Sequence, residues 1–230
     1  MNFEVIWDSL PQYWQAAWVT LQLLFMALLI GLTVAIPLAV LRAANNPWFS
    51  KPIWFFTYLI RGTPMLVQLF LIYYGAGQFE WIRESFAWSY LSSAWFCAVL
   101  AFAINTCAYT TEMLAGAIKA TPIGEVEAAI SMGMSRVRMF VRILLPAAFR
   151  RALPAYSNEV IMMLHGTSLA STVTIMDLTG VAREVNSRHY LPYEAFIIGA
   201  LFYLAMTFVL VGIARLAERY FLKHLVRKAH

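Results

Sequence analysis

The chain has 230 residues, of which 61% are hydrophobic and 13% charged, with a formal net charge of +5. Soluble domains average about 45–50% apolar and about 25% charged residues, so this composition excludes a soluble protein and indicates a membrane protein. A helix needs about 20 mostly apolar residues to cross the bilayer; several such stretches are present, and the remainder leaves no room for a second, soluble domain.

The first apolar stretch, at 19–41, follows a segment that contains Glu4 and Asp8 but no Lys or Arg. A cleaved signal peptide begins with positive charge, so we expect this stretch to be retained as a transmembrane helix. Four more stretches follow it, and five spans are predicted in all: 19–41, 53–75, 94–117, 154–176 and 195–214.

The basic residues are distributed unevenly between these spans. Thirteen of the 17 Lys and Arg residues lie in one set of alternate segments, three lie in the other, and Arg61 lies inside the second span. By the positive-inside rule, the N-terminus is outside and the C-terminus cytoplasmic. Topology and anionic lipid headgroups account for the basic charge, so no nucleic-acid partner is expected.

The second span contains YLIRGTPMLVQLF, with an arginine that would be costly at the centre of a bilayer. The residue before a proline avoids helical angles, and Thr and Pro are favoured at helix starts. One interpretation is a helix that begins at Thr63, with Arg61 near the cytoplasmic face and 50–60 at the interface. The other is a single helix kinked at Pro64.

Polar residues recur along the third span at helical spacing: Asn105, Tyr109, Glu112 and Gly116. They share one stripe of a helix, which must face protein or water rather than lipid. These side chains either join neighbouring helices by hydrogen bonds or line a pathway.

The fourth span carries a similar stripe, formed by Asn158, Met162, His165, Leu169 and Thr172. Glu159 lies beside it and costs ~2.5–3.5 kcal/mol on insertion scales, so it needs a partner or an aqueous cavity. A neutral His165 is also satisfied by one hydrogen bond between helices. No second His or Cys stands at ligand spacing, so no metal is expected.

The segment between the third and fourth spans is too polar to cross a membrane. Residues 124–132 place Ala128 and Ala129 on one helical face, and Gly133 then interrupts the helix, where glycine costs ~1 kcal/mol. Apolar residues at 137–144 form a second stripe. The pattern predicts two short helices on the cytoplasmic surface, either docked in a groove of another protein or lying on lipid headgroups.

Five motifs resemble permease subunits of bacterial ATP-binding-cassette importers, in the branch for polar amino acids. They are RGTPMLVQL at 61–69, NTCAYTTEMLAGAI at 105–118, GEVEAAISMG at 124–133, ILLPAAFRRALP at 143–154 and NEVIMMLHGTSL at 158–169. The resemblance covers about residues 20–220. It is strongest to the M-type permeases of the histidine/lysine/arginine/ornithine and octopine or arginine systems, and a histidine at position 165 fits that subgroup.

The resemblance implies an all-α integral membrane protein with five transmembrane helices, the transmembrane domain of a type I importer. It implies one domain over 1–230, with a core at about 19–219 and a cytoplasmic coupling loop, the EAA loop, at 118–153. The protein would be a multi-pass component of the bacterial cytoplasmic (inner) membrane.

The resemblance also implies partners. These are a homologous permease subunit in a homo- or heterodimer, two ATPase subunits that bind ATP and Mg, and a periplasmic amino-acid-binding protein. The ATPase contacts would be Glu127, Ala128, Ala129 and Gly133. The chain has no GxxxxGK[ST] phosphate loop, so we expect no cofactor in it and no enzymatic activity of its own.

The predicted function is uptake of polar, in particular basic, amino acids by alternating access. Candidate pathway residues are Glu159, Asn158, His165, Ser168, Thr172, Asn105, Tyr109 and Glu112. One alternative is an ion-coupled secondary transporter working without an ATPase, but no convincing internal repeat is present. The other is an intramembrane hydrolase, but HExxH and GxSxG motifs are absent.

Overall fold

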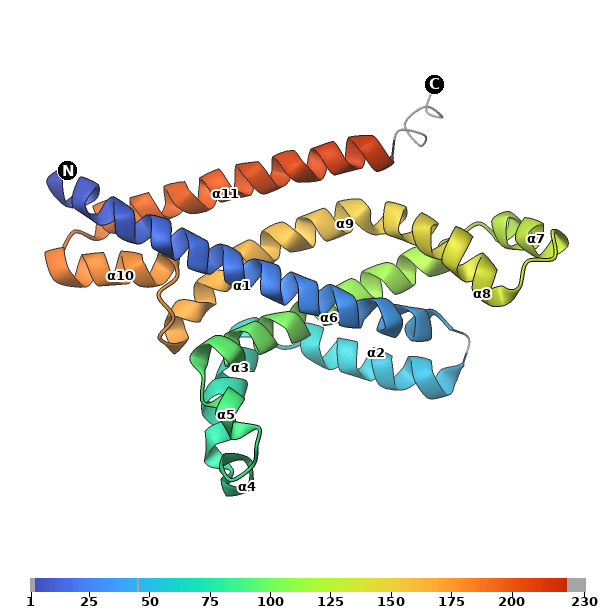
Figure 1. Cartoon of the computed structure of the whole chain (residues 1–230), viewed down its shortest axis with the longest axis horizontal. Helices are drawn as coiled ribbons and strands as arrows, with labels where there is room; N and C mark the ends of the chain where they lie inside the picture. The colour runs from blue at the N-terminus through green and yellow to red at the C-terminus, as the bar shows by residue number, and fades with distance from the viewer. Residues whose placement is uncertain (1–2, 45, 223–230) are drawn as a thin grey trace.

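The computed structural model of the protein describes residues 3–44 and 46–222. Every regular element within these residues is a helix, and the long helices form an elongated bundle (Figure 1). In chain order the elements are α1 Phe3–Ala43, α2 Pro47–Arg61, α3 Met65–Phe70, η1 Leu71–Gly75, η2 Ala76–Gln78, α4 Glu80–Arg83, α5 Trp88–Leu91, α6 Ala94–Lys119, α7 Ile123–Ser131, α8 Arg136–Met139, η3 Phe140–Leu144, α9 Leu145–Gly166, η4 Thr167–Val173, α10 Leu178–His189 and α11 Pro192–Phe221.

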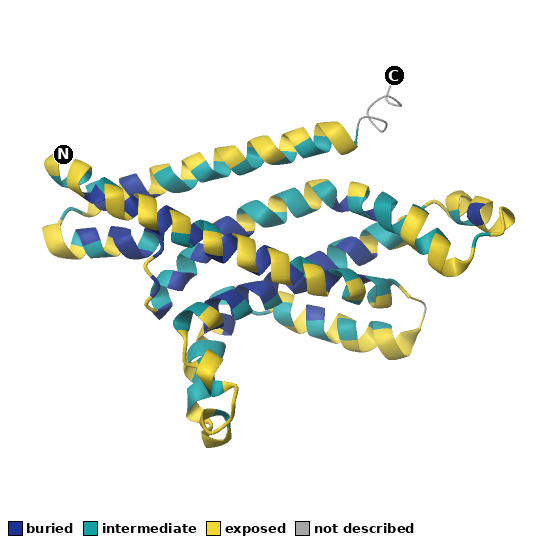
Figure 2. Cartoon of the chain, in the orientation of Figure 1, coloured by how far each residue is buried: buried dark blue, intermediate teal, exposed yellow. Residues whose placement is uncertain are grey.

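The centre of the bundle is the pair formed by α1 and α6, where the buried residues gather (Figure 2). Leu23, Leu24 and Ala27 of α1 belong to one buried cluster with Ala98 and Phe102 of α6. Without a hydrophobic driving force between helices in lipid, close packing must hold such a pair together. The helix pair therefore depends on complementary shapes at this interface.

Gly31 of α1 lies directly against α6. A Cβ atom at this position would be 2.3 Å from Cγ2 of Thr106 and 3.1 Å from the carbonyl oxygen of Ala103. Small residues at membrane-helix interfaces let two backbones approach closely. Gly31 is therefore required for the observed contact between α1 and α6.

The second predicted span is broken into α2 and α3, with a bend of 100° between α2 and the segment that starts at Met65. This angle supports a true break over a simple kink. The expected helix start at Thr63 is wrong, because α3 begins at Met65 and Pro64 occupies the N-cap position with extended backbone. Thr63 thus remains on the α2 side, where its hydroxyl donates to the carbonyl oxygen of Leu59 at 3.0 Å.

The polar segment between the third and fourth predicted spans lies at one end of the bundle, where α7 projects beyond the central helices (Figure 1). Gly133 follows α7 with φ +71°, a conformation that glycine adopts readily. The predicted break is confirmed, but the second helix is not short. From Arg136 to Gly166, α8, η3 and α9 are continuous. The π-helical turn η3 precedes Pro146 and accommodates its missing N–H.

The other end of the bundle is held by buried polar contacts. Tyr13 of α1 donates to the carbonyl oxygen of Ala195 at 2.8 Å. Asp177 is fully buried and caps α10 by accepting from the Gly180 amide at 2.9 Å, while Tyr203 of α11 donates to it at 3.1 Å. These bonds fix α11 against α1 and against the start of α10.

Three described helices, α1, α6 and α11, are long and apolar enough to cross a membrane, and the number is five if each of two bent helix pairs forms one span. The second bent pair joins 136–173 to 178–189 at 48°. Large apolar side chains are exposed on α1 and α11, such as Phe25 at 59% and Phe208 at 67% (Figure 2). Such surfaces suit contact with lipid or with other membrane helices.

Candidate functional site

A cavity of about 720 Å³ lies where the break between α2 and α3 faces α6 and α9. Its size is within the range of ligand pockets, about 300–1,000 Å³. The lining residues are Arg61, Gly62, Thr63, Pro64 and Met65 at the break, Asn105, Tyr109 and Met113 on α6, and Ala155, Asn158, Glu159, Met162 and Met163 on α9.

Four residues that the sequence placed on a pathway meet in this cavity. Asn105 and Tyr109 come from α6, and Asn158 and Glu159 from α9. Asn105 is only 8% exposed, whereas Asn158 lies open to the cavity side of α9. The two stripes, far apart in the sequence, therefore face one another across a shared space.

The three remaining candidates of the fourth span do not line this cavity. The Ser168 hydroxyl donates to the carbonyl oxygen of His165 at 2.7 Å, and that of Thr172 to Leu169 at 2.6 Å. His165 Nε2 lies 3.3 Å from the Thr207 hydroxyl of α11. The helix tightens to 3₁₀ geometry at 167–173, with 3.0 residues per turn, so Thr172 departs from a stripe predicted at α-helical spacing. His165 precedes this segment, in α9, and faces α11 instead.

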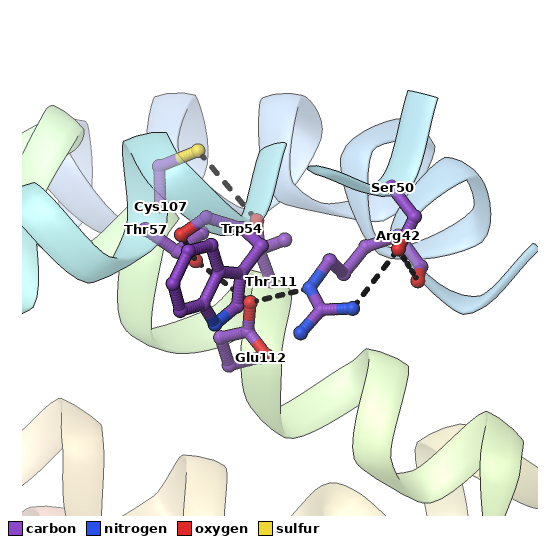
Figure 3. Close-up of polar contacts among 7 residues, drawn as sticks. All are labelled: Arg42, Ser50, Trp54, Thr57, Cys107, Thr111 and Glu112. Carbon is purple, nitrogen blue, oxygen red and sulfur yellow. Dashed lines mark hydrogen bonds and ion pairs between the residues drawn. The ribbon is translucent and has the colours of Figure 1, made fainter. Parts of the chain in front are cut away.

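Glu112 faces α1 and α2 (Figure 3). Its Oε1 accepts from Arg42 Nε at 2.8 Å and from the Thr57 hydroxyl at 2.7 Å. Arg42 Nη1 also donates to the Ser50 hydroxyl at 3.0 Å. The side chains of Arg42 and Glu112 are 16% and 20% exposed, so this ion pair is largely withdrawn from solvent and joins three helices.

Two opposite charges line the cavity from different helices. The Arg61 guanidinium lies over the Tyr109 ring, 5.2 Å from its centroid, a cation–π contact that orients it. Among the described residues, the ion pairs do not include Arg61 or Glu159. The cavity thus presents a separated cation and anion, as a ligand that carries both charges requires.

The cost of Arg61 in lipid predicts a position near the cytoplasmic face, but the sequence pattern does not predict its place in the cavity. The signal was present, because an ionisable residue within a span usually faces a water-filled space. The adjacent break at Gly62–Pro64 supplies that space here.

The predicted coupling residues lie on and after α7, and they are Glu127, Ala128, Ala129 and Gly133. All are exposed except Ala129, which is 2% exposed. Ile130 and Met132 are 60% and 83% exposed on the same segment. A short helix with exposed apolar side chains beyond the bundle is typical of a surface that contacts another protein.

The described residues contain no group of three or more His, Cys, Asp or Glu side chains that would hold a metal ion. The cavity offers amides, thioethers, a hydroxyl, a phenol and one charge of each sign. These groups suit reversible binding of a small polar molecule.

The sequence matches a protein family described as "binding-protein-dependent transport system inner membrane component" over residues 27–223. The chain belongs to this family. This membrane component is 44% identical over 226 residues to the nopaline transport system permease protein NocM of Agrobacterium fabrum, covering 98% of the chain and 94% of that relative. It is 47% identical over 207 residues to the histidine/lysine/arginine/ornithine transport system permease protein HisM of Escherichia coli, covering 90% and 87%.

Solved structures agree with the family assignment. The crystal structure of an amino acid ABC transporter with histidines superposes with a TM-score of 0.84 at 31% identity, covering 96% of this chain and 99% of that one. An inward-facing MetNI methionine ABC transporter gives 0.71 at 16% identity, which supports the fold alone. This family member is therefore a membrane component of a transport system and not an enzyme.

Proposed function

We propose that this chain is the permease subunit of an ATP-binding-cassette importer for basic amino acids, and that the cavity is where the solute crosses. The carrying observation is the cavity that places Arg61 and Glu159 on opposite helices. An amino acid carries a carboxylate that complements Arg61 and ammonium groups that complement Glu159. The named solutes of the HisM relative, histidine, lysine, arginine and ornithine, support this class.

Five spans with the N-terminus outside and the C-terminus in the cytoplasm complete this proposal. The two bent helix pairs count as one span each, and 13 of the 17 Lys and Arg residues then lie on the cytoplasmic side. This topology places α7 in the cytoplasm. The whole chain is one permease domain, with 118–153 as its cytoplasmic coupling loop.

Energy enters through partner ATPases, which bind the ATP and Mg that this chain does not. Two ATPase subunits contact Glu127, Ala128, Ala129 and Gly133, and a second permease subunit completes the pathway. An extracytoplasmic binding protein delivers the solute. The exposed α7 segment, joined to the bundle on one side through the continuous helix that leads into α9, supports this route.

Alternating access follows from the same arrangement. Closure of the ATPases draws α7 toward its counterpart in the second permease, and α6 and α9 move with it, opening the cavity outward. A ligand drives such a change only if it binds the two states with different affinity, so both ATP and the loaded binding protein favour the outward form.

Reconstitution of the complex in liposomes tests this function through Glu159→Gln. Loss of the carboxylate is expected to raise the KM for arginine about tenfold, equivalent to about 1.4 kcal/mol, and that for glutamine much less. Glu218→Gln, on α11 away from the cavity, is the matched control. An equal effect on both solutes would refute a cation-binding role, and arginine uptake without the ATPases would favour an ion-coupled transporter.

A further inference from the structure

Gln68 is a polar residue inside the bundle that belongs to α3 and is only 7% exposed. Its Nε2 donates to the carbonyl oxygen of Ile60 at 2.7 Å, to that of Thr63 at 3.1 Å and to the Thr63 hydroxyl at 2.8 Å. The last carbonyl groups of a helix have no partner within the helix. Gln68 therefore satisfies the end of α2 at the point where the span breaks.

These contacts fix which way the Gln68 amide faces. The Thr63 hydroxyl donates its proton to Leu59 O at 3.0 Å, so its oxygen is an acceptor toward Gln68. All three atoms around Nε2 are thus acceptors, and an amide turned the other way would place its carbonyl oxygen against them. The Gln68 Oε1 atom must therefore point in the opposite direction, toward α6.

The orientation of the Gln68 amide in turn sets the orientation of the Asn105 amide on α6. Its Nδ2 donates to Gln68 Oε1 at 3.1 Å, which directs the Asn105 Oδ1 atom to the other side. Asn105 lines the cavity, and within the described part of the chain its one side-chain hydrogen bond is the bond from Nδ2 to Gln68. The end of α2 thus determines that the acceptor atom of Asn105, Oδ1, lies on the side away from Gln68.

We propose that Gln68 is a positioning residue that holds Asn105 as a hydrogen-bond acceptor for the positively charged group of the solute. Gln68 does not line the cavity itself and acts through Asn105 and through the turn that carries Arg61 and Thr63. The inference rests on the proposed function, since it assumes that the solute crosses this cavity. It deepens that function by assigning a second acceptor beside Glu159 to a cationic solute.

The experiment uses the complete reconstituted transporter and measures arginine uptake per assembled complex. Gln68→Met keeps the side-chain length but removes the orienting amide, so Asn105 is free to turn its donor into the cavity. The KM for arginine is expected to rise about fivefold, the effect of one hydrogen bond, with kcat within twofold. Gln78→Met, at an exposed glutamine on the same segment of chain, is the control and keeps the parental KM.

Asn105→Asp separates positioning from a merely structural role, because aspartate offers acceptors in either orientation. Combined with Gln68→Met, it is expected to restore the KM for arginine to within about twofold of the parent. Introduced alone, with Gln68 intact, it lacks the donor that Oε1 needs, so the single variant is expected to perform worse than the double variant. The added negative charge is common to both variants, so a lower KM in the double variant than in the single variant reports on the orientation.

Two results would overturn the inference: an unchanged KM in assembled Gln68→Met, or no rescue by Asn105→Asp. If Gln68→Met does not assemble, Asn105→Leu replaces it, because this variant keeps Gln68 and the end of α2 but removes the acceptor from the cavity. An unchanged KM for arginine in assembled Asn105→Leu would overturn the inference equally. If Glu159→Gln shows the expected rise in the KM for arginine but Gln68→Met leaves that KM unchanged, only the role of Gln68 is refuted. If Glu159→Gln changes the KM values for arginine and glutamine equally, the proposed binding of a cationic solute in this cavity is itself refuted.

Discussion

The Arg42 guanidinium donates to the Glu112 carboxylate at 2.8 Å and thereby joins the end of α1 to α6 (Figure 3). Thr57 donates to the same oxygen from α2. A carboxylate that is satisfied by two other helices is held away from a solute. The polar stripe of the third span thus divides into a part that lines the cavity and a part that fastens the bundle.

Glu112→Leu is therefore expected to destabilise the transporter without changing its affinity for solute. The change leaves Arg42 Nε without its acceptor in a largely buried place, whereas Thr57 can still donate to the carbonyl oxygen of Trp54 at 3.0 Å, and the expected loss is about 1–3 kcal/mol. Thermal unfolding of the purified complex measures the loss, and the KM for arginine is expected to stay within twofold. Glu80→Leu removes an exposed 3.9 Å ion pair to Arg83 as the control. A raised KM with normal stability would return Glu112 to the pathway.

Gly31→Ala is expected to weaken the central helix pair. The new Cβ would lie 2.3 Å from Cγ2 of Thr106, and overpacking of this kind costs about 1–3 kcal/mol. Thr106→Ser removes Cγ2, so the double variant is expected to recover most of the decrease in the midpoint temperature of thermal unfolding. Gly212→Ala adds a Cβ with no atom within 4 Å and serves as the control. Absence of rescue would show that another contact limits the approach.

The long apolar helices and the breaks at Gly62–Pro64 and Gly133 could be predicted from sequence, because hydropathy and the special angles of Gly and Pro are local properties. The side on which a polar residue faces is not local. Asn105 and Glu112 lie two turns apart on one predicted stripe, yet Asn105 meets the cavity and Glu112 meets Arg42. That difference depends on where α1 and α2 pack against α6. The periodicity of residues 105–116 carries no information about that packing.

The end of the fourth-span stripe shows a second limit. Thr172 fits the predicted α-helical spacing and Ser168 is a candidate beside it, but the helix is 3₁₀ from Thr167 onward, and both hydroxyls bond to backbone carbonyls three residues earlier. Gly166, just before, lies where a Cβ would be 2.4 Å from Cε of Met65. A contact with α3 therefore coincides with the change of helix type, and such a tertiary contact cannot be read from the pattern.

Gly133→Ala is expected to reduce coupling to ATP hydrolysis through backbone strain. Gly133 has φ +71° and open space around its missing Cβ, so the cost is conformational, about 1–2 kcal/mol for an ordinary residue. Asparagine tolerates this region better, so arginine-stimulated ATPase activity is expected to fall in the order Gly, Asn, Ala. Gly124→Ala, inside α7 with equally open space, is the control and keeps normal activity. Equal activity of all three residues at 133 would exclude a role for this turn.

Arg151→Met is expected to uncouple α9 from the end of α6. Arg151 Nε donates to the carbonyl oxygen of Ala117 in the last turn of α6 at 3.2 Å, and its Nη2 donates to the Thr121 hydroxyl. Charge-assisted bonds to the last carbonyls of a helix are favourable because of the helix dipole as well. Through these bonds, motion of α9 reaches the chain that leads into α7. Arginine-stimulated ATP hydrolysis is therefore expected to fall severalfold.

Arg150→Met supplies the matched control for this prediction, because Arg150 is exposed and its Nε bonds only within its own helix, to Pro146 O at 3.3 Å. Both variants remove one positive charge from the same turn of α9, so any effect of charge on topology or lipid binding is common to them. A selective loss in Arg151→Met is then due to the bridge to α6. Equal losses in both variants would contradict the bridge and assign the effect to charge, since only Arg151 reaches another helix.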